Sequence, residues 1–332
     1  HASAGDGRDH GVKPQNFQTR DAEIIERFLS MRREGKLGDR RLNLSWSNWG
    51  FGIEEFRTSV KRLASNDVRY IELHGNKYGP DLGYEPQKVK RILDDNGLKV
   101  SGICGMVSPE NELSSNRPHV RQRAIDYFRR QIDMCAELGG TYILFAPGAV
   151  GRTQAPDNYE FERAAETIRI VADDFQESGI RGAVEPVRAA EVSFCHTCSD
   201  AKKLLGMIDH PGVKHIAADL YHILAGESHV AGTLVDYGDD IINLHVADSN
   251  RLALGRGVLD LDMVIMALYV IGYNREDAFC SAEPLGPGGD PYPQMHGCPS
   301  EEFLDDLVSQ TARYFYERES EVLAASDAEL RR

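Results

Sequence analysis

Short apolar runs alternate with amphipathic helical stripes from about residue 41 to the end of the chain. Runs of four to seven mostly apolar residues between turn residues are typical of buried parallel strands. We predict eight such strands, over residues 42–45, 70–73, 99–103, 142–145, 182–186, 213–219, 241–247 and 279–283. Strand followed by helix, eight times over, predicts a parallel sheet that closes into a barrel. The expected fold class is therefore α/β, a (β/α)8 TIM barrel over residues 41–316.

The helical stripes between these strands show the expected spacing of three or four residues. One stripe consists of Val120, Ala124, Phe128, Ile132 and Cys135. A second stripe covers residues 303–315 and follows Ser300, which we predict to be its N-cap.

Two terminal segments fall outside the barrel pattern. Residues 1–40 form a polar N-terminal extension with one short helical stretch, 22–33, and residues 317–332 are predicted to be a charged, solvated C-terminal tail. Within the barrel, residues 286–300 form a long loop rich in Gly and Pro after the last strand. In this architecture such loops line the active face. No change in composition marks a second domain.

Four successive predicted strands each bring one charged or imidazole side chain to the carboxyl end. These residues are Glu185, Asp219, His245 and Glu283. A charge at the end of a buried strand is costly unless it is paired, although a single one is commonly a helix cap. Four in succession favour a divalent cation. Three carboxylates and one imidazole suit Mn²⁺, Mg²⁺ or Co²⁺ better than structural zinc, which prefers Cys and His.

This ligand set suggests a chemistry. Four protein ligands on a six-coordinate ion leave two positions, which a neighbouring hydroxyl and carbonyl of a sugar can fill. The ion would polarise the carbonyl and stabilise an enediolate. Candidate substrate-binding residues follow the ligands: Glu191, His222 and Arg251, with His296 in the long loop. Taken alone, His222 also fits a polar helix start and Arg251 a surface ion pair. Gly255 and Gly257 mainly indicate a turn.

Composition excludes several partners. The chain has 332 residues with a net charge of −14, which disfavours nucleic acid and anionic membranes because both require a basic face. No apolar stretch approaches the roughly 18 residues of a membrane span, and residues 1–20 contain no hydrophobic signal core. Six cysteines without a secretory signal predict free thiols and a cytoplasmic location, and we interpret Cys195 and Cys198 as buried thiols. Acidic barrels of this size are expected to form oligomers.

Four segments resemble the xylose-isomerase-like barrel superfamily, and within it the ketose 3-epimerases. They are residues 185–191, residues 219–222, residues 245–251 with Gly255-Arg-Gly257, and Ala282-Glu283-Pro284. The similarity runs from about Leu42 to Tyr316. It implies that Glu185, Asp219, His245 and Glu283 bind Mn²⁺ or a similar ion. It also implies that Glu185 and Glu283 exchange a proton on opposite faces of one sugar carbon, and that Glu191, His222 and Arg251 grip substrate oxygens.

Three features depart from the epimerase pattern: the N-terminal extension, the long loop and the segment 72–84. They are similar to a related group, the α subunit of C-glycoside deglycosidases. That resemblance implies a lyase that cleaves the carbon–carbon bond of 3-oxo-C-glycosides together with a small β-rich partner subunit. The extension would dock the partner, and Trp46, Trp49 and Phe51 would either stack on a sugar or aglycone or pack in the core.

Two other functions are disfavoured. A non-catalytic sugar-binding barrel predicts a missing ligand, and all four are present. An endonuclease of the related metal-barrel type needs additional histidines and a basic groove, which the acidic composition opposes.

Overall fold

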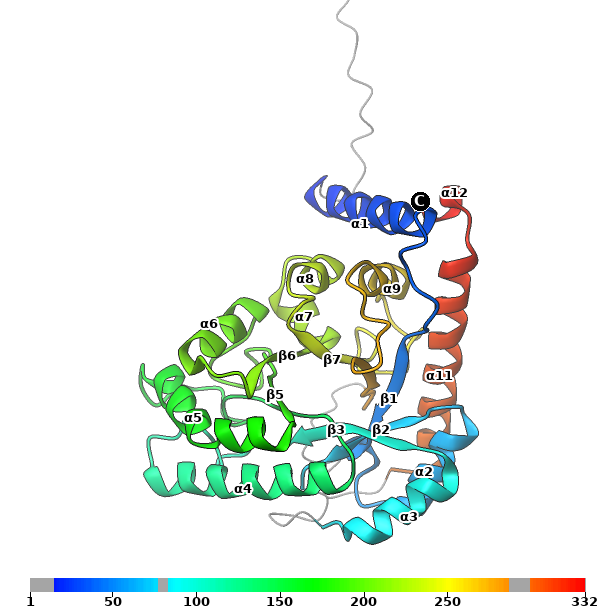
Figure 1. Cartoon of the computed structure of the whole chain (residues 1–332). Coiled ribbons are helices and arrows are strands. Elements are labelled where there is room, and N and C mark those ends of the chain that lie inside the picture. The colour runs from blue at the N-terminus through cyan, green and yellow to red at the C-terminus, as the bar shows by residue number, and fades with distance from the viewer. Residues whose placement is uncertain (1–14, 77–82, 287–298, 332) are drawn as a thin grey trace, which may run out of the picture.

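The predicted closed barrel is confirmed in a computed structural model, which describes residues 15–76, 83–286 and 299–331. Parallel strands follow one another in sequence order, and β1 pairs with β8 to close the barrel (Figure 1). The strands are β1 (Asn43–Ser47), β2 (Tyr70–His74), β3 (Lys99–Gly105), β4 (Tyr142–Phe145), β5 (Arg181–Val184), β6 (Val213–Asp219), β7 (Ile241–Val246) and β8 (Phe279–Ala282). Their ends differ from the predicted ends by no more than two residues.

Helices surround this barrel and cover its outer face (Figure 1). In chain order they are α1 (Gln15–Arg33), the 3₁₀ helix η1 (Asn48–Phe51), α2 (Phe56–Ser65), α3 (Pro86–Asn96), α4 (Pro118–Glu137), α5 (Glu160–Ser178), α6 (Cys198–Ile208), α7 (Leu220–Gly226), α8 (Val230–Asp236), α9 (Leu261–Val270), α11 (Glu301–Ala324) and α12 (Asp327–Leu330). The predicted stripe on α4 is buried, and Ser300 caps α11 by accepting a hydrogen bond from the backbone of Phe303.

Helix α1 of the N-terminal extension is longer than predicted and packs on the outside of the barrel. It begins at Gln15 rather than at residue 22, and it contacts α8 and α9 (Figure 1). Its side chains bond to α8 and to the residue before it: Arg20 pairs with Asp236, and Asp21 lies 2.9 Å from Nε2 of His229. At least one face of the extension is therefore occupied by this chain's own helices.

The segment beyond residue 316, predicted to be a solvated tail, is helical and partly buried in the described residues. Helix α11 continues to Ala324, where Val322 is buried, and Leu330 of α12 is buried too. Arg318 forms an ion pair with Asp262 of α9 at 2.7 Å. The isolated apolar residues of this segment show no stripe in the sequence. They are buried because α11 packs on α9 and Leu330 lies beside α1 and α9. The boundaries at residues 40 and 316 stay a prediction, although α11 crosses the second.

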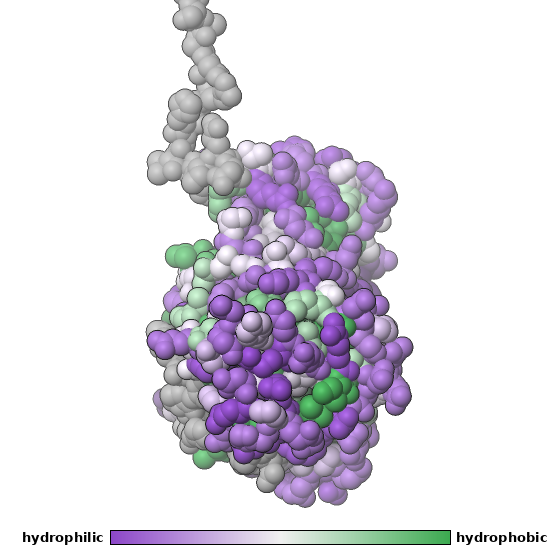
Figure 2. Space-filling view, turned by 90° about the vertical axis from the view of Figure 1, so that its left-hand side faces the viewer, coloured by the Kyte–Doolittle hydropathy of each residue, from purple (hydrophilic) through white to green (hydrophobic). Residues whose placement is uncertain are grey.

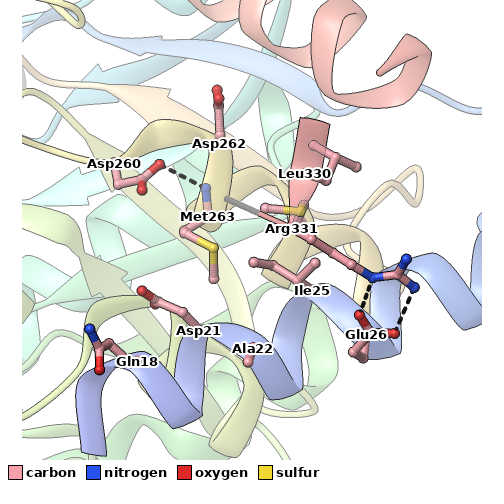
Figure 3. Close-up of a pocket in the computed structure, with 11 residues that line it drawn as sticks. Gln18, Asp21, Ala22, Ile25, Glu26, Asp260, Asp262, Met263, Leu330 and Arg331 are labelled. Carbon is pink, nitrogen blue, oxygen red and sulfur yellow. Dashed lines mark hydrogen bonds and ion pairs between the residues drawn. The ribbon is translucent and has the colours of Figure 1, made fainter. Parts of the chain in front are cut away.

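A cavity of about 560 Å³ lies between α1, α9 and α12, and we call it the α1–α9 cleft (Figure 3). Its lining includes apolar side chains, such as Ile25 and Met263, and four acidic ones. The acidic residues are Asp21, Glu26, Asp260 and Asp262. Figure 3 shows Arg331 reaching across to Glu26, so that the cleft is closed partly by an ion pair.

The outer surface is mainly hydrophilic, as expected for a chain with 27% charged residues. Figure 2 views the side that carries α5 and α6, where hydrophilic residues dominate and only small apolar groups interrupt them. No helix among the described residues is both long and apolar enough to cross a bilayer. The described cysteines, Cys195 and Cys198 included, are free and buried, which confirms the predicted thiols; Cys298 lies outside the described residues.

Candidate metal and active site

The four predicted ligands come together at the carboxyl ends of β5 to β8. Glu185 follows β5, Asp219 ends β6, His245 lies in β7, and Glu283 follows β8. They converge because the carboxyl ends of parallel barrel strands share one face. Asp219 is also the N-cap of α7, where its Oδ1 accepts a hydrogen bond from the backbone of Tyr221 at 2.8 Å. The role of these residues as metal ligands stays a prediction, but the structure places them side by side.

Nδ1 of His245 is the centre of the cluster. It lies 3.1 Å from Oε2 of Glu283, 3.3 Å from Oε1 of Glu185 and 3.8 Å from Oδ2 of Asp219. Although this nitrogen is buried, it makes no hydrogen bond. Buried polar atoms are nearly always bonded, so an unbonded nitrogen facing three carboxylates indicates a missing positive partner.

A divalent cation fits this donor set. Glu185, Asp219 and His245 each offer one ligand atom, and these atoms lie within 4.8 Å of one another, so they can hold a metal ion. Glu283 is not part of that compact group, but its Oε2 lies 3.1 Å from Nδ1 of His245. Oxygen donors with one imidazole match the preference of hard or borderline cations.

Charge is concentrated here on buried side chains, where solvent screens it little. Burial raises the pKa of Glu185 to about 7. Burial alone would raise the pKa of Asp219, but the nearby positive charge of Arg251 holds it well below its usual value. Burial alone would lower the pKa of His245, yet Glu283 and Glu72 outweigh burial and raise that pKa well above its ordinary value. The cluster therefore requires a proton or a cation to balance its carboxylates.

The predicted substrate residues Glu191, His222 and Arg251 line the same cavity as Glu185 and Glu283. The cavity has a volume of about 50 Å³. Nε2 of His222 lies 3.5 Å from Oδ2 of Asp219, and its Nδ1 lies 3.8 Å from Oε2 of Glu191. Burial lowers the pKa of His222 to about 4, so its ring is neutral at ordinary pH. His296 lies outside the described residues.

Arg251 is fixed by backbone as well as by charge. Its guanidinium lies 2.9 Å from Oδ2 of Asp219 and 3.3 Å from Oε2 of Glu283. Its carbonyl accepts hydrogen bonds from Leu285 and Gly286, which tie the turn after β7 to the end of β8. Asp248 holds that turn by accepting the backbone N–H of Gly255 at 2.8 Å.

Gly257 completes this turn. A Cβ atom at Gly257 would lie 2.0 Å from Oδ1 of Asp248, so the close approach requires glycine. Gly255 has a φ of +88°, in the region that favours glycine. The turn indicated by these two glycines is thus the one that presents Arg251.

Glu72 and Arg188 were not among the predicted site residues, and Trp49 was predicted only to stack on a sugar or aglycone or to pack in the core. Glu72 of β2 lies 2.7 Å from Nε2 of His245, Trp49 of η1 donates its indole N–H to Oε1 of Glu283, and Nε of Arg188 donates to Glu191 at 2.5 Å. An acidic residue inside an otherwise apolar strand was the available signal for Glu72. Trp46 and Phe51 instead stack on each other in the core, with ring centroids 5.8 Å apart.

Comparisons with known proteins agree with the fold. A family model described as xylose isomerase-like TIM barrel matches residues 60–296. A ketose 3-epimerase of Arthrobacter globiformis is 28% identical over 231 residues, which are 69% of this chain and 78% of the relative. A 3-dehydro-D-guloside 4-epimerase of Escherichia coli (strain K12) is 24% identical over 196 residues, 56% of this chain and 73% of the relative.

A solved structure shares the fold. The D-allulose 3-epimerase from Methylomonas sp. in complex with D-allulose superposes with a TM-score of 0.71 at 18% identity, covering 84% of this chain and 98% of that one. Since the family model spans more than half of a chain that folds as a closed parallel barrel, the protein belongs to the xylose isomerase-like TIM barrel family.

Proposed function

We propose that the protein is a metal-dependent enzyme that epimerises a keto sugar by moving a proton at the carbon next to the carbonyl. The observation that carries this proposal is the buried, unbonded Nδ1 of His245 with three carboxylates at 3.1 to 3.8 Å. The sugar epimerases among the relatives support the same class of reaction.

The proposed cation is held by Glu185, Asp219, His245 and Glu283. Mn²⁺ is our first candidate, with Mg²⁺ and Co²⁺ as alternatives. When bound, it supplies Lewis acidity that polarises the sugar carbonyl and acidifies the neighbouring C–H group.

Glu185 and Glu283 are the proposed acid–base pair. One carboxylate takes the proton from one face of the sugar carbon, and the other returns a proton to the opposite face, which inverts the centre. A pKa of about 7 for Glu185 suits this exchange because an acid–base group works best near the operating pH. Trp49 and Arg251 bond to different oxygens of Glu283 and thereby fix the orientation of its carboxylate.

Glu191, His222 and Arg251 are proposed to hold the other oxygens of the sugar. A neutral His222 can donate or accept a hydrogen bond, whereas Arg251 can only donate. Only 5% of His222 and 4% of Arg251 are exposed, so a bound sugar meets them in a site with little water.

A second candidate is the α subunit of a C-glycoside deglycosidase. The Escherichia coli relative is by name an epimerase of a 3-dehydro-glycoside, which supports a keto sugar that keeps its aglycone. In the lyase, the same proton removal is followed by cleavage of the carbon–carbon bond, and a small β-rich partner subunit is required. The cytoplasmic location and the oligomeric state stay predictions under either function.

The epimerase is tested by incubating ketohexoses with Mn²⁺-loaded protein in deuterated solvent. NMR then measures deuterium exchange at carbon 3. We expect Glu283→Gln to slow exchange by about 10³-fold, a typical contribution of acid–base catalysis. Glu276→Gln, an exposed residue of the loop before β8, is the matched control and should exchange at the wild-type rate.

Two outcomes would redirect the proposal. Full activity of Glu283→Gln would remove the acid–base assignment. Turnover of a 3-oxo-C-glycoside only after a small partner protein is added, without exchange on free ketohexoses, would replace the epimerase with the lyase.

A further inference from the structure

A carboxylate lies inside the barrel, on the side of His245 that faces away from the predicted ligands. Glu72 is in the middle of β2 and is 0% exposed. Its Oε1 lies 2.7 Å from Nε2 of His245. Its Oε2 accepts the hydroxyl of Tyr142 at 2.5 Å and the side-chain amide of Asn243 at 3.1 Å. Both oxygens are therefore occupied by donors.

This contact determines which nitrogen of His245 is available. An ionised carboxylate only accepts hydrogen bonds, so Nε2 must carry a hydrogen. In the neutral ring, Nδ1 then presents its lone pair to Glu185, Asp219 and Glu283. The hydrogen bond to Glu72 therefore accounts both for the bonded Nε2 and for the Nδ1 that makes no hydrogen bond.

We propose that Glu72 is a positioning residue, which holds His245 in the tautomer and orientation that let Nδ1 bind the divalent cation. The proposal rests on the cation of the proposed function, but not on which sugar is turned over. Glu72 does not touch the substrate cavity, whose lining residues do not include it.

Glu72 is itself held by residues from several strands. Asn243 of β7 accepts a hydrogen bond from Ser281 of β8 at 2.6 Å, and Tyr142 comes from β4. A buried carboxylate is costly unless hydrogen bonds compensate it, and here β4 and β7 supply the donors besides His245. These bonds hold Glu72 in place, and its direct hydrogen bond to Nε2 fixes the orientation of the imidazole ring of His245.

Cys104 offers a competing explanation. Glu72, Cys104 and His245 also present ligand atoms within 4.8 Å of one another, as a second cation site would. However, a cation there would replace the direct hydrogen bond between Glu72 and His245. We therefore expect one ion per chain, and Cys104 provides a matched control within the same triangle of residues.

The first test is titration calorimetry of the full chain with Mn²⁺. Removing the partner of a metal-binding histidine typically weakens metal affinity by about 10 to 100-fold, and we expect this of Glu72→Gln. Cys104→Ser should bind one ion with wild-type affinity. Tyr142→Phe keeps the carboxylate but removes one of its donors, so its affinity should fall between those two variants.

The second test reads the tautomer directly. In protein labelled with ¹⁵N-histidine and loaded with Mg²⁺, the ring of His245 is assigned by its absence in His245→Gln. We expect hydrogen on Nε2 in the wild type and in Cys104→Ser, and a mixed or altered ring state in Glu72→Gln. A purely structural role of Glu72 would leave this signature unchanged.

Wild-type Mn²⁺ affinity and an unchanged ring state in folded Glu72→Gln would overturn the proposal. So would two ions per chain with one lost in Cys104→Ser. If circular dichroism finds Glu72→Gln unfolded, Tyr142→Phe decides, because wild-type affinity in that variant contradicts the proposal. A wild-type chain that binds Mn²⁺ but exchanges no ketohexose proton removes the proposed function alone.

Discussion

The barrel centre and the α1–α9 cleft both gather acidic side chains, but they balance these charges differently. In the cleft, each of the four carboxylates has a donor. Asp21 bonds His229, Glu26 pairs with Arg331, Asp260 accepts the backbone of Met263, and Asp262 pairs with Arg318. At the centre, three carboxylates surround one nitrogen that has no hydrogen bond. Acidic residues alone therefore do not indicate a cation site, whereas a buried nitrogen without a hydrogen bond among three carboxylates does.

Two histidines sharpen the same point. Nδ1 of His215 and Nδ1 of His245 are both buried without a hydrogen bond. Burial, then Arg181 and Lys214, lowers the pKa of His215 to about 4, while the carboxylates around His245 raise its pKa despite burial. An unbonded nitrogen thus indicates a cation only where negative charge surrounds it.

Removal of the cation should have the largest effect. Dialysis against a chelator should abolish deuterium exchange at carbon 3 and lower the unfolding temperature, and Mn²⁺ should restore both. A cation at 100 times its Kd stabilises the folded state by about 2.7 kcal/mol. Elemental analysis should confirm that the dialysed protein contains no metal. If such protein still exchanges deuterium at the full rate, the carboxylates around His245 do not serve to bind a cation, and the contrast with the α1–α9 cleft is lost.

Asp262→Asn tests the cleft with a smaller effect. Arg318 donates to both oxygens of Asp262, at 2.7 Å each, and Asp262 is 7% exposed. We expect urea denaturation to show a loss of about 1 to 2 kcal/mol, because the guanidinium loses its charged partner in a partly buried place. Mn²⁺ affinity should not change, and a change would mean that the cleft and the barrel centre are coupled.

The pH dependence of stability should show the contribution of His215, which lies outside the metal site. Because its pKa is depressed from 6.5 to about 4 in the folded state, the unfolded chain takes up this proton first. Stability is therefore unaffected above pH 6.5 and falls as the pH decreases toward 4, by about 1 kcal/mol after allowance for solvent screening. His215→Gln should reduce the slope in this pH range, to which His222 also contributes, and an unchanged slope would contradict the assignment.

Glu26→Gln should have the smallest effect. Its ion pair with Arg331 is exposed, with 52% and 46% of the two side chains accessible. Exposed pairs add little to stability because solvent screens them, so the unfolding temperature should stay within error of the wild type. A clear decrease would mean that this pair holds α12 onto α1 more strongly than an ordinary surface pair does.

Much of the fold follows from local patterns. Each apolar run became a strand, because a parallel strand covered on both faces must be apolar along its whole length. The partial burial of the tail was not predictable, because Val322 and Leu330 stand among charged residues and are buried only by helices elsewhere in the chain. The site was partly predictable too, since a charge that ends an apolar run is visible in the sequence.

The sequence by itself determined the closed barrel and the convergence of Glu185, Asp219, His245 and Glu283, because the same strand pattern repeats and strand ends share one face. Only the tertiary structure decided how those side chains are oriented and balanced. Glu72 and His245 are 173 residues apart in the chain yet bonded in the barrel. A hydrogen bond depends on distances of a few tenths of an ångström between strands, and hydrophobic patterning does not encode distances of that kind.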